Sequence, residues 1–185
     1  MKIGIVIGSI RTGRRGEAVA RWVADLTQDR GGVEYEVIDL ATFDLPLLTD
    51  EVIPAAADRD YSSPQVRAWS KAIDAVDGFV FVSPEYNHGI PGAFKNAFDS
   101  IYPEWANKAV TFVAYGAAGG VRVVEHWRGV VANAHLYATR GQVALSNFTD
   151  FAEDGSVITS ARLEGDLTSC LDQLEALAGA VAVLR

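Results

Sequence analysis

The chain of 185 residues is 49% hydrophobic and 22% charged, which is the composition of an ordinary globular protein with a sizeable core. Its formal net charge of −8 leaves no basic surface to neutralise nucleic-acid phosphates, so no nucleic-acid partner is expected. The single Cys170 excludes an intramolecular disulfide and a Cys-x-x-Cys pair, and this fits a cytoplasmic protein.

Strand-like apolar runs alternate with helical patterns along the whole chain, which we expect to form one domain over residues 1–185. The expected strands are Lys2–Gly8, Val33–Asp39, Gly78–Ser83, Ala109–Tyr115 and Gln142–Leu145. The expected helices are Gly16–Gln28, Pro64–Ala75, Gly92–Tyr102, Gly120–Leu136 and Leu163–Leu177. This alternation predicts an α/β three-layer sandwich around a five-stranded parallel sheet in the flavodoxin-like order 2-1-3-4-5. Ligands of such folds bind at the carboxyl ends of the first and third strands.

Two segments bear on location and assembly. The apolar run Ile3–Ile10 follows Lys2, but arginines come next and no small-residue cleavage site appears, so no signal peptide is expected. No uninterrupted apolar run reaches the roughly 18 residues of a membrane span, so no membrane partner is expected.

The proline-containing segment Ala41–Ser63 is long for a loop. Two interpretations stay open: the segment borders the site or a subunit contact, or it is a surface loop without a function.

The loop after the first strand reads Gly8-Ser9-Ile10-Arg11-Thr12-Gly13-Arg14-Arg15-Gly16. Its glycines expose backbone N–H groups, the next helix adds positive partial charge, and Arg11 can bind phosphate oxygens. Arg14 and Arg15 stand where a nucleotide-hydrolysing P-loop has Lys and Ser or Thr, and no Gly-x-Gly-x-x-Gly occurs. A terminal phosphate monoester is the expected ligand, and a glycine-rich turn with solvated arginines is the alternative.

The loop after the third strand reads Ser83-Pro84-Glu85-Tyr86-Asn87-His88-Gly89-Ile90-Pro91. It offers an aromatic ring, side-chain amides and backbone N–H groups, but no acid–base pair. This set of groups suits the binding of a flat heteroaromatic cofactor better than hydrolysis.

A third loop, Tyr115-Gly116-Ala117-Ala118-Gly119-Gly120, follows the fourth strand. We expect the next helix to direct its N-terminus into the same crevice, where it would stabilise negative charge on a bound ring. Tight turns of α/β proteins commonly contain glycine, so this loop alone is a weak signal.

Several other reactive or aromatic side chains are expected to be structural. His88, His126 and His135 lack metal-ligand spacing, so no metal site is expected, and His126 and His135 are expected on one helix with Trp127. The residues expected in the core are Cys170, Phe94, Phe98 and Ile101. Part of the helix face that carries Phe94, Phe98 and Ile101 is expected to contact a second subunit, together with Trp105 and Trp127.

Gly8-Ser9-x-Arg11 combined with Pro84-Glu85-Tyr86-Asn87 resembles the NADPH-dependent FMN reductase family, which includes flavodoxin-like azo, quinone and chromate reductases. Lys95-Asn96-Ala97-Phe98-Asp99, Tyr115-Gly116 and Gly119-Gly120 extend the resemblance over almost the whole chain. The resemblance implies that Ser9, Arg11 and the backbone from Gly13 to Gly16 bind the FMN phosphate. It also implies that Pro84, Glu85, Tyr86 and Asn87 border the ribityl chain and the isoalloxazine ring.

The resemblance places the backbone around Tyr86, Asn87 and His88 near flavin N5 and O4, and Gly116, Gly119 and Gly120 on the opposite side of the ring. Members of the family often have Ser and Asn in the stretch where this chain has Gly13-Arg14-Arg15-Gly16-Glu17. Arg14 or Arg15 is expected to compensate at the FMN phosphate. A second hypothesis gives one of these arginines, expected to be exposed, the 2′-phosphate of NADPH.

The implied activity is that of an NAD(P)H-dependent oxidoreductase with FMN as cofactor and a small acceptor, such as a flavin, quinone, azo compound or metal oxyanion. The flavin carries the chemistry, so no certain catalytic side chain is expected. The resemblance also implies a homodimer or homotetramer. Two alternatives stay open: a flavodoxin-type electron carrier without NAD(P)H turnover, and a protein that has lost flavin affinity through its altered first loop.

Overall fold

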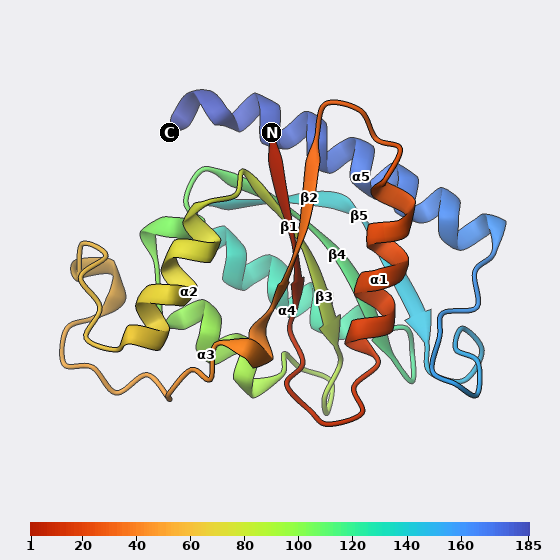
Figure 1. Ribbon diagram of the computed structural model, residues 1–185, viewed down its shortest axis with the longest axis horizontal. Coiled ribbons are helices and arrows are strands. Elements are labelled where there is room, and N and C mark those ends of the chain that lie inside the picture. The colour runs from red at the N-terminus through yellow and green to blue at the C-terminus, as the bar shows by residue number, and fades with distance from the viewer.

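The computed structural model describes residues 1–185 and contains one five-stranded sheet in the order β2-β1-β3-β4-β5, with all neighbours parallel. The strands are β1 (Lys2–Ile7), β2 (Glu34–Asp39), β3 (Gly78–Pro84), β4 (Lys108–Gly116) and β5 (Leu136–Ser146). The helices are α1 (Gly16–Thr27), α2 (Pro64–Asp74), α3 (Gly92–Asp99), α4 (Val121–Asn133) and α5 (Ala161–Val181). The predicted flavodoxin-like topology is confirmed, and the carboxyl ends of the strands meet at one edge of the sheet (Figure 1).

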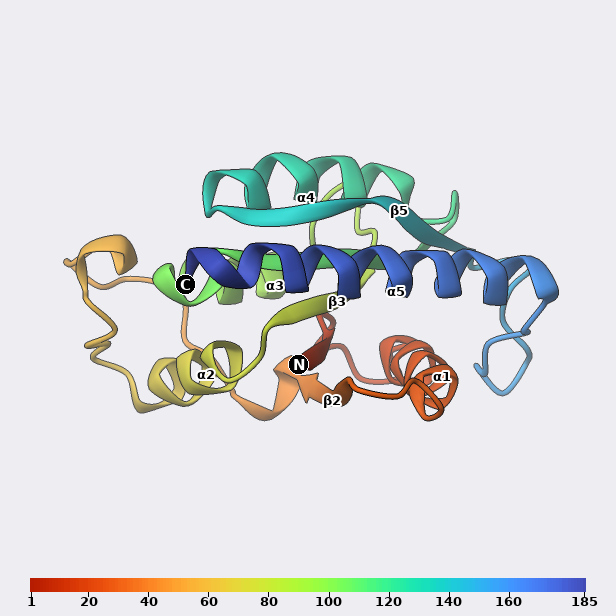
Figure 2. The same cartoon turned by 90° about the horizontal axis from the view of Figure 1, so that it is seen from above.

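Helices cover both faces of the sheet (Figures 1 and 2). Side chains of α1 and α5 form one hydrophobic cluster with the sheet, and those of α2, α3 and α4 form the other. Every residue of β3 and of β4 is buried, because these central strands are covered on both faces. This explains why the third strand is an uninterrupted apolar run in the sequence.

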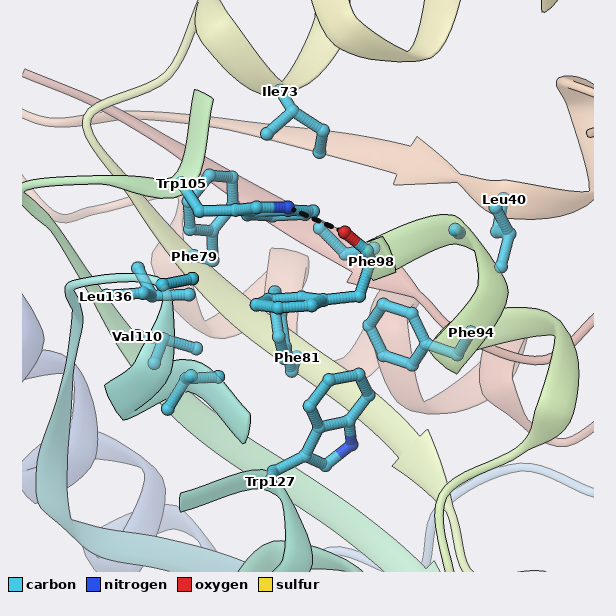
Figure 3. Packing of buried hydrophobic residues seen from close by; sticks show 14 of the residues in the cluster. Leu40, Ile73, Phe79, Phe81, Phe94, Phe98, Trp105, Val110, Trp127 and Leu136 are labelled. Atoms are coloured by element: carbon cyan, nitrogen blue, oxygen red, sulfur yellow. Dashed lines mark hydrogen bonds between the residues drawn. The ribbon is translucent and has the colours of Figure 1, made fainter. Parts of the chain in front are cut away.

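An aromatic cluster holds α3 and α4 against the sheet (Figure 3). The ring of Phe81 on β3 lies 4.9 Å from that of Phe94, 5.2 Å from that of Trp127 and 5.9 Å from that of Trp105, between centroids. The indole N–H of Trp105 donates to the carbonyl of Phe98 at 3.0 Å. Both tryptophans are fully buried within one subunit, so their expected place at a subunit contact is wrong. The predicted burial of Phe94, Phe98, Ile101 and Cys170 is confirmed.

The predicted boundaries differ from the structure mainly around α4 and β5. Strand β5 begins at Leu136 instead of Gln142, because it pairs with β4 on both sides of a register shift between Val110 and Phe112. Helix α4 ends at Asn133, and His135 lies in the following turn with a φ of 53°, so the expected helix shared by His126 and His135 is wrong. The polar residues Thr139 and Arg140 near the register shift interrupt the apolar pattern, so the first half of β5 was not predicted.

Helix α5 and the turn after it, Ala161–Leu184, are long and apolar enough to cross a membrane by length and composition. In this fold the helix packs one face against the sheet. The side chains of that face include Leu163, Leu167, Leu171 and Leu174. Core helices of α/β proteins meet the same criterion of length and composition, so α5 is a core helix here.

Lys108 is a buried cation at the start of β4. Its Nζ donates to the carbonyls of Ile73 at 2.7 Å and Asp74 at 3.1 Å at the end of α2, and burial lowers the pKa of the amine to about 8. The pKa is lower in the folded than in the unfolded protein, so unfolding takes up protons between about pH 8 and pH 10.5.

We therefore expect the wild-type free energy of unfolding, relative to that of Lys108→Met, to rise with pH across this window by about 3 kcal/mol. Urea unfolding of both proteins at several pH values measures the difference. The control is Lys71→Met, an exposed lysine on α2, whose difference from wild type should stay constant. If the free energies of unfolding of wild type and Lys108→Met differed by the same amount at every pH, the lowered pKa of Lys108 would be contradicted.

Candidate cofactor site

The carboxyl ends of β1, β3, β4 and β5 bring their loops together around a pocket of about 490 Å³. The lining residues are Ser9, Arg11, Gly13, Arg14, Arg15, Pro84, Glu85, Tyr86, Tyr115, Asn147 and Phe148. All but the last three were singled out in the sequence as site residues, so the structure brings the first two loops to one place. Gly16, Asn87, His88, Gly116, Gly119 and Gly120 do not line this pocket.

The first loop presents free backbone donors to this pocket. None of the N–H groups from Ser9 through Ala18 donates a hydrogen bond to another protein group. Helix α1 begins at Gly16 and has no side-chain cap, so its positive end is also free. The backbone at Gly13 has a φ of 66°, which lets the loop reverse direction without strain. Such a run of donors at a helix N-terminus is suited to a phosphate.

Arg11 and Arg14 occupy different electrostatic environments. Arg11 is exposed, forms no ion pair, and places its guanidinium carbon 5.8 Å from the ring centre of Tyr86. The Arg14 side chain is only 9% exposed and pairs with Asp39 at 2.6 Å and Glu17 at 2.7 Å. It also donates to the carbonyl of Ser9 at 2.7 Å. The expected exposure of Arg14 is wrong, and its charge is neutralised within the protein.

Arg15 ties the first loop to the loop that follows β5. Its guanidinium donates to the backbone carbonyl and to the side-chain Oδ1 of Asn147, each at 3.0 Å, and lies 4.5 Å from the ring centre of Phe151. Arg15 is therefore half-buried instead of exposed. Asn147 and the exposed Phe148 are pocket residues that the sequence reasoning missed. Their position at the carboxyl end of β5 was the signal that could have found them.

Three residues that line the pocket carry hydroxyl groups. The buried Ser9 Oγ and the Tyr86 hydroxyl are 2.7 Å apart. The hydroxyl of Tyr115 is buried and has no hydrogen-bond partner. Burial raises the pKa of Tyr115 well above its usual value, so this group stays a neutral phenol. An unpaired buried hydroxyl beside a polar pocket leaves a hydrogen-bonding position for a ligand or a water molecule.

The second loop makes a tight two-residue turn at Asn87 and His88. Tyr86 and Gly89 exchange backbone hydrogen bonds of 3.1 and 2.9 Å, and the φ angles of Asn87 and His88 are 49° and 65°. Both residues are exposed, and neither of their N–H groups donates within the protein. The turn therefore carries two free donors next to the pocket.

Glu85 occupies the helix end that was expected to face the ligand. Its side chain is 6% exposed and accepts from the backbone N–H groups of Arg122 at 3.0 Å and Val123 at 3.4 Å, and from the Arg122 guanidinium at 2.9 Å. The expectation that the N-terminus of α4 stabilises charge on a ligand is therefore wrong. The Glu85 carboxylate already stabilises this helix end, because β3 and β4 are neighbours and the loop after β3 begins beside the start of α4.

Replacing Glu85 by Ala is expected to lower the free energy of unfolding by about 1–2 kcal/mol, because α4 loses its cap and Arg122 its partner. Thermal or urea unfolding measures the loss. Glu125→Ala is the matched control: this exposed glutamate on the same helix makes only a 3.6 Å pair with Arg128, and less than about 0.5 kcal/mol is expected. Equal effects of the two substitutions would contradict the capping role.

The glycines of the third loop are explained by backbone packing. A Cβ at Gly120 would lie 2.8 Å from the backbone nitrogen of Tyr115, and Gly119 and Gly120 have φ angles of 73° and 69°. A Cβ at Gly116 would lie 3.1 Å from the Cβ of Glu85. Their identity therefore follows from the tight turn between β4 and α4. No group of three or more His, Cys, Asp or Glu side chains that could hold a metal ion is present.

The topology defines a protein of the flavodoxin-like class, and a polar pocket beside the run of free N–H groups after β1 lies at the β1/β3 switch point. The profile of the family described as NADPH-dependent FMN reductase matches residues 1–150, and the chain belongs to this family. Helix α5 lies beyond the matched region but completes the core on one face of the sheet.

Named relatives agree with this assignment. An NAD(P)H-dependent FMN reductase of Nectria sp is 39% identical over 125 positions, which span 65% of this chain but only 62% of that protein. An NAD(P)H:quinone oxidoreductase of Solanum tuberosum is 33% identical over 188 positions, covering 96% of this chain and 93% of the relative. The structure of the flavoenzyme FerB, an NAD(P)H:(acceptor) oxidoreductase from Paracoccus denitrificans, has a TM-score of 0.74 at 21% identity, over 95% of this chain and 97% of FerB. The last comparison supports the fold.

Proposed function

We propose that this protein is an FMN-dependent NAD(P)H oxidoreductase that reduces a small acceptor, such as a flavin, a quinone, an azo compound or a metal oxyanion. The observation that carries the proposal is the unbroken run of free N–H groups from Ser9 to Ala18 beside Arg11, which has no acidic partner. Family membership and the names of the relatives support it. In this proposal residues 1–185 act as one domain in the cytoplasm.

The first loop would hold the FMN phosphate. Arg11 supplies the positive charge, the backbone from Gly13 to Gly16 supplies N–H donors, and Ser9 supplies a hydroxyl. Arg14 positions the loop, because its guanidinium donates both to the Ser9 carbonyl and to the Asp39 carboxylate. Arg15 positions it from the other side through Asn147. With Arg14 paired, the hypothesis that it binds the 2′-phosphate of NADPH loses its support.

The second and third loops would border the rest of the cofactor. Pro84 and Tyr86 would flank the ribityl chain, together with the unpaired hydroxyl of Tyr115. The free N–H groups of Asn87 and His88 would donate to N5 and O4 of the ring. Glu85 would act indirectly by fixing the start of α4, and Gly116, Gly119 and Gly120 would bring the backbone close on the opposite side. Bound FMN supplies the hydride-accepting ring, so the protein contributes position and electrostatics.

The visible spectrum of the purified protein with added FMN, followed by NADPH or NADH without oxygen, tests this function. A protein-bound flavin spectrum that bleaches rapidly is the expected result. Bound flavin that stays oxidised with both nucleotides would instead identify a flavodoxin-type electron carrier. Failure to bind any FMN would overturn the site assignment and favour a protein without flavin affinity.

We further propose that the protein forms a homodimer or homotetramer through the segment between β2 and α2, which extends away from the sheet (Figures 1 and 2). Ile53 in this segment is 65% exposed, and Leu47 and Val52 are exposed beside it. Ile53→Asp is expected to shift the mass measured by light scattering towards that of the monomer. Val183→Asp, at an 83% exposed position near the C-terminus, is the control and should leave the mass unchanged.

A further inference from the structure

A second hollow, of about 410 Å³, lies at the same edge of the sheet and shares no lining residue with the cofactor pocket. Ile10 of the first loop forms one side. Leu40 and Leu47 form another, from the segment after β2, and Ala93 forms the third, from α3. Its volume falls in the range of roughly 300–1,000 Å³ that is usual for small-molecule sites.

The walls of this hollow are mostly apolar and carry no positive charge. Six of its eight lining residues are hydrophobic, and none is a lysine, arginine or histidine. Asn96, one of the two polar residues, is held within the protein: its side chain donates to the carbonyl of Pro46 and accepts from the N–H of Leu48, each at 2.9 Å. These bonds fasten the segment after β2 to α3 and build the wall of the hollow.

Asp44 is the remaining polar residue, and its exposed carboxylate has neither an ion-pair nor a hydrogen-bond partner within the protein. A carboxylate only accepts hydrogen bonds and repels anions. The hollow therefore disfavours phosphates, carboxylates and metal oxyanions. It favours a neutral ring compound that carries a hydroxyl or amino donor, with the ring against the apolar walls and the donor towards Asp44.

We infer that this hollow binds neutral aromatic compounds bearing a hydroxyl or amino donor, as a subsite beside the cofactor pocket. The source of such compounds rests on the proposed function. Reduction of quinones yields hydroquinones, and reduction of azo compounds yields aryl amines. A quinone has only acceptor oxygens, whereas its reduced form has donors. Asp44 thus makes the hollow bind the reduced products, which carry donors, more tightly than the oxidised acceptors.

The hollow also touches the cofactor loop. Ile10 stands between Ser9 and Arg11, so an occupant in contact with Ile10 restrains the loop that carries the free N–H groups. By linkage, occupation of the hollow and binding at the cofactor pocket then influence each other's affinity to the same extent.

Calorimetric titration tests the inference on the protein saturated with FMN and without reduced nicotinamide. The probes are β-naphthol, its methyl ether, which lacks the donor, and β-naphthoate, which is an anion. We expect β-naphthol to bind about fivefold more tightly than the ether, since a donor to a carboxylate contributes roughly 1 kcal/mol at an exposed position, and β-naphthoate to bind most weakly.

Two variants locate the binding. Ala93→Leu fills the hollow from a half-buried position on α3, and we expect the affinity for β-naphthol to fall at least about tenfold. Asp44→Asn removes the charge at a φ of 46° that Asn tolerates, and we expect the preference for β-naphthol over the ether to fall below about twofold. Asp58→Asn is the matched control at a φ of 47°, also exposed and unpaired, and should keep the wild-type preference.

Three results would overturn the inference. They are equal affinities for β-naphthol and its ether, unchanged binding in Ala93→Leu, and a new long-wavelength flavin absorbance on adding β-naphthol, which would place the ring on the flavin. The same titration without FMN separates the two proposals. Naphthol binding that persists in a protein unable to bind FMN would support the hollow while contradicting the proposed function.

Discussion

Arg11→Ala is expected to lower the affinity for FMN about 10- to 100-fold, the effect of losing charge-assisted hydrogen bonds to a phosphate. The other arginines of the pocket cannot readily replace it, because Arg14 is held by Asp39 and Glu17 and Arg15 by Asn147. Riboflavin, which lacks the phosphate, should bind wild type and variant equally. Quenching of flavin fluorescence during titration of the flavin-free protein measures both affinities.

The control for Arg11→Ala is Arg21→Ala, which removes the same charge from an exposed position on α1 that forms no ion pair. It should change FMN affinity less than about twofold, because exposed charges are screened by salt over about 10 Å. An equal loss in the two variants would reduce the role of Arg11 to its contribution to net charge. Unchanged FMN affinity in Arg11→Ala would contradict the phosphate assignment.

Gly8→Ala is expected to lower the free energy of unfolding by about 3 kcal/mol and to weaken FMN binding as well. A Cβ at Gly8 would overlap ring atoms of Phe94, which is fully buried. This ring cannot move freely, because it lies 4.9 Å from the ring of Phe81 and 4.8 Å from that of Trp127 (Figure 3). Either the core or the start of the cofactor loop must shift. Urea unfolding and FMN titration measure the two effects.

Gly92→Ala is the matched control for Gly8→Ala. A Cβ at Gly92, the first residue of α3, meets nothing within 4 Å, so no loss of stability is expected. In the double variant Gly8→Ala/Phe94→Leu, the smaller side chain should recover part of the stability that Gly8→Ala loses. Wild-type stability of Gly8→Ala, or a double variant less stable than the two losses added together, would refute the clash with Phe94.

Much of the fold follows from local patterns in the sequence. The alternation of apolar runs and helical periodicity predicted the parallel sheet and its strand order, and both are confirmed. The first half of β5 could not be predicted, because its pairing with β4 across a register shift outweighs the polar character of Thr139 and Arg140. Trp105 and Trp127 were misplaced for a related reason: aromatic residues suit a core and an interface equally well until their neighbours are known.

The part of the cofactor pocket that could be predicted is formed by the loops that directly follow β1 and β3. Ser9, Arg11 and Tyr86 were found because loops at the carboxyl ends of β1 and β3 must meet at the switch point. Asn147 and Phe148 were missed, because the residues of the fifth loop carry no motif. They reach the pocket only through the place of β5 beside β4.

Periodicity and glycine-rich motifs are local properties of the chain, so the sequence alone predicts the class of fold, the family resemblance and the loop that carries the phosphate-type donors. Which charges of that loop are free depends on contacts between residues far apart in the chain. Arg14 is neutralised by Asp39, 25 residues further along the chain, and Glu85 caps a helix 37 residues away, whereas Arg11 has no acidic partner. Ion pairs depend on which strands are neighbours, and that arrangement exists only in the folded sheet.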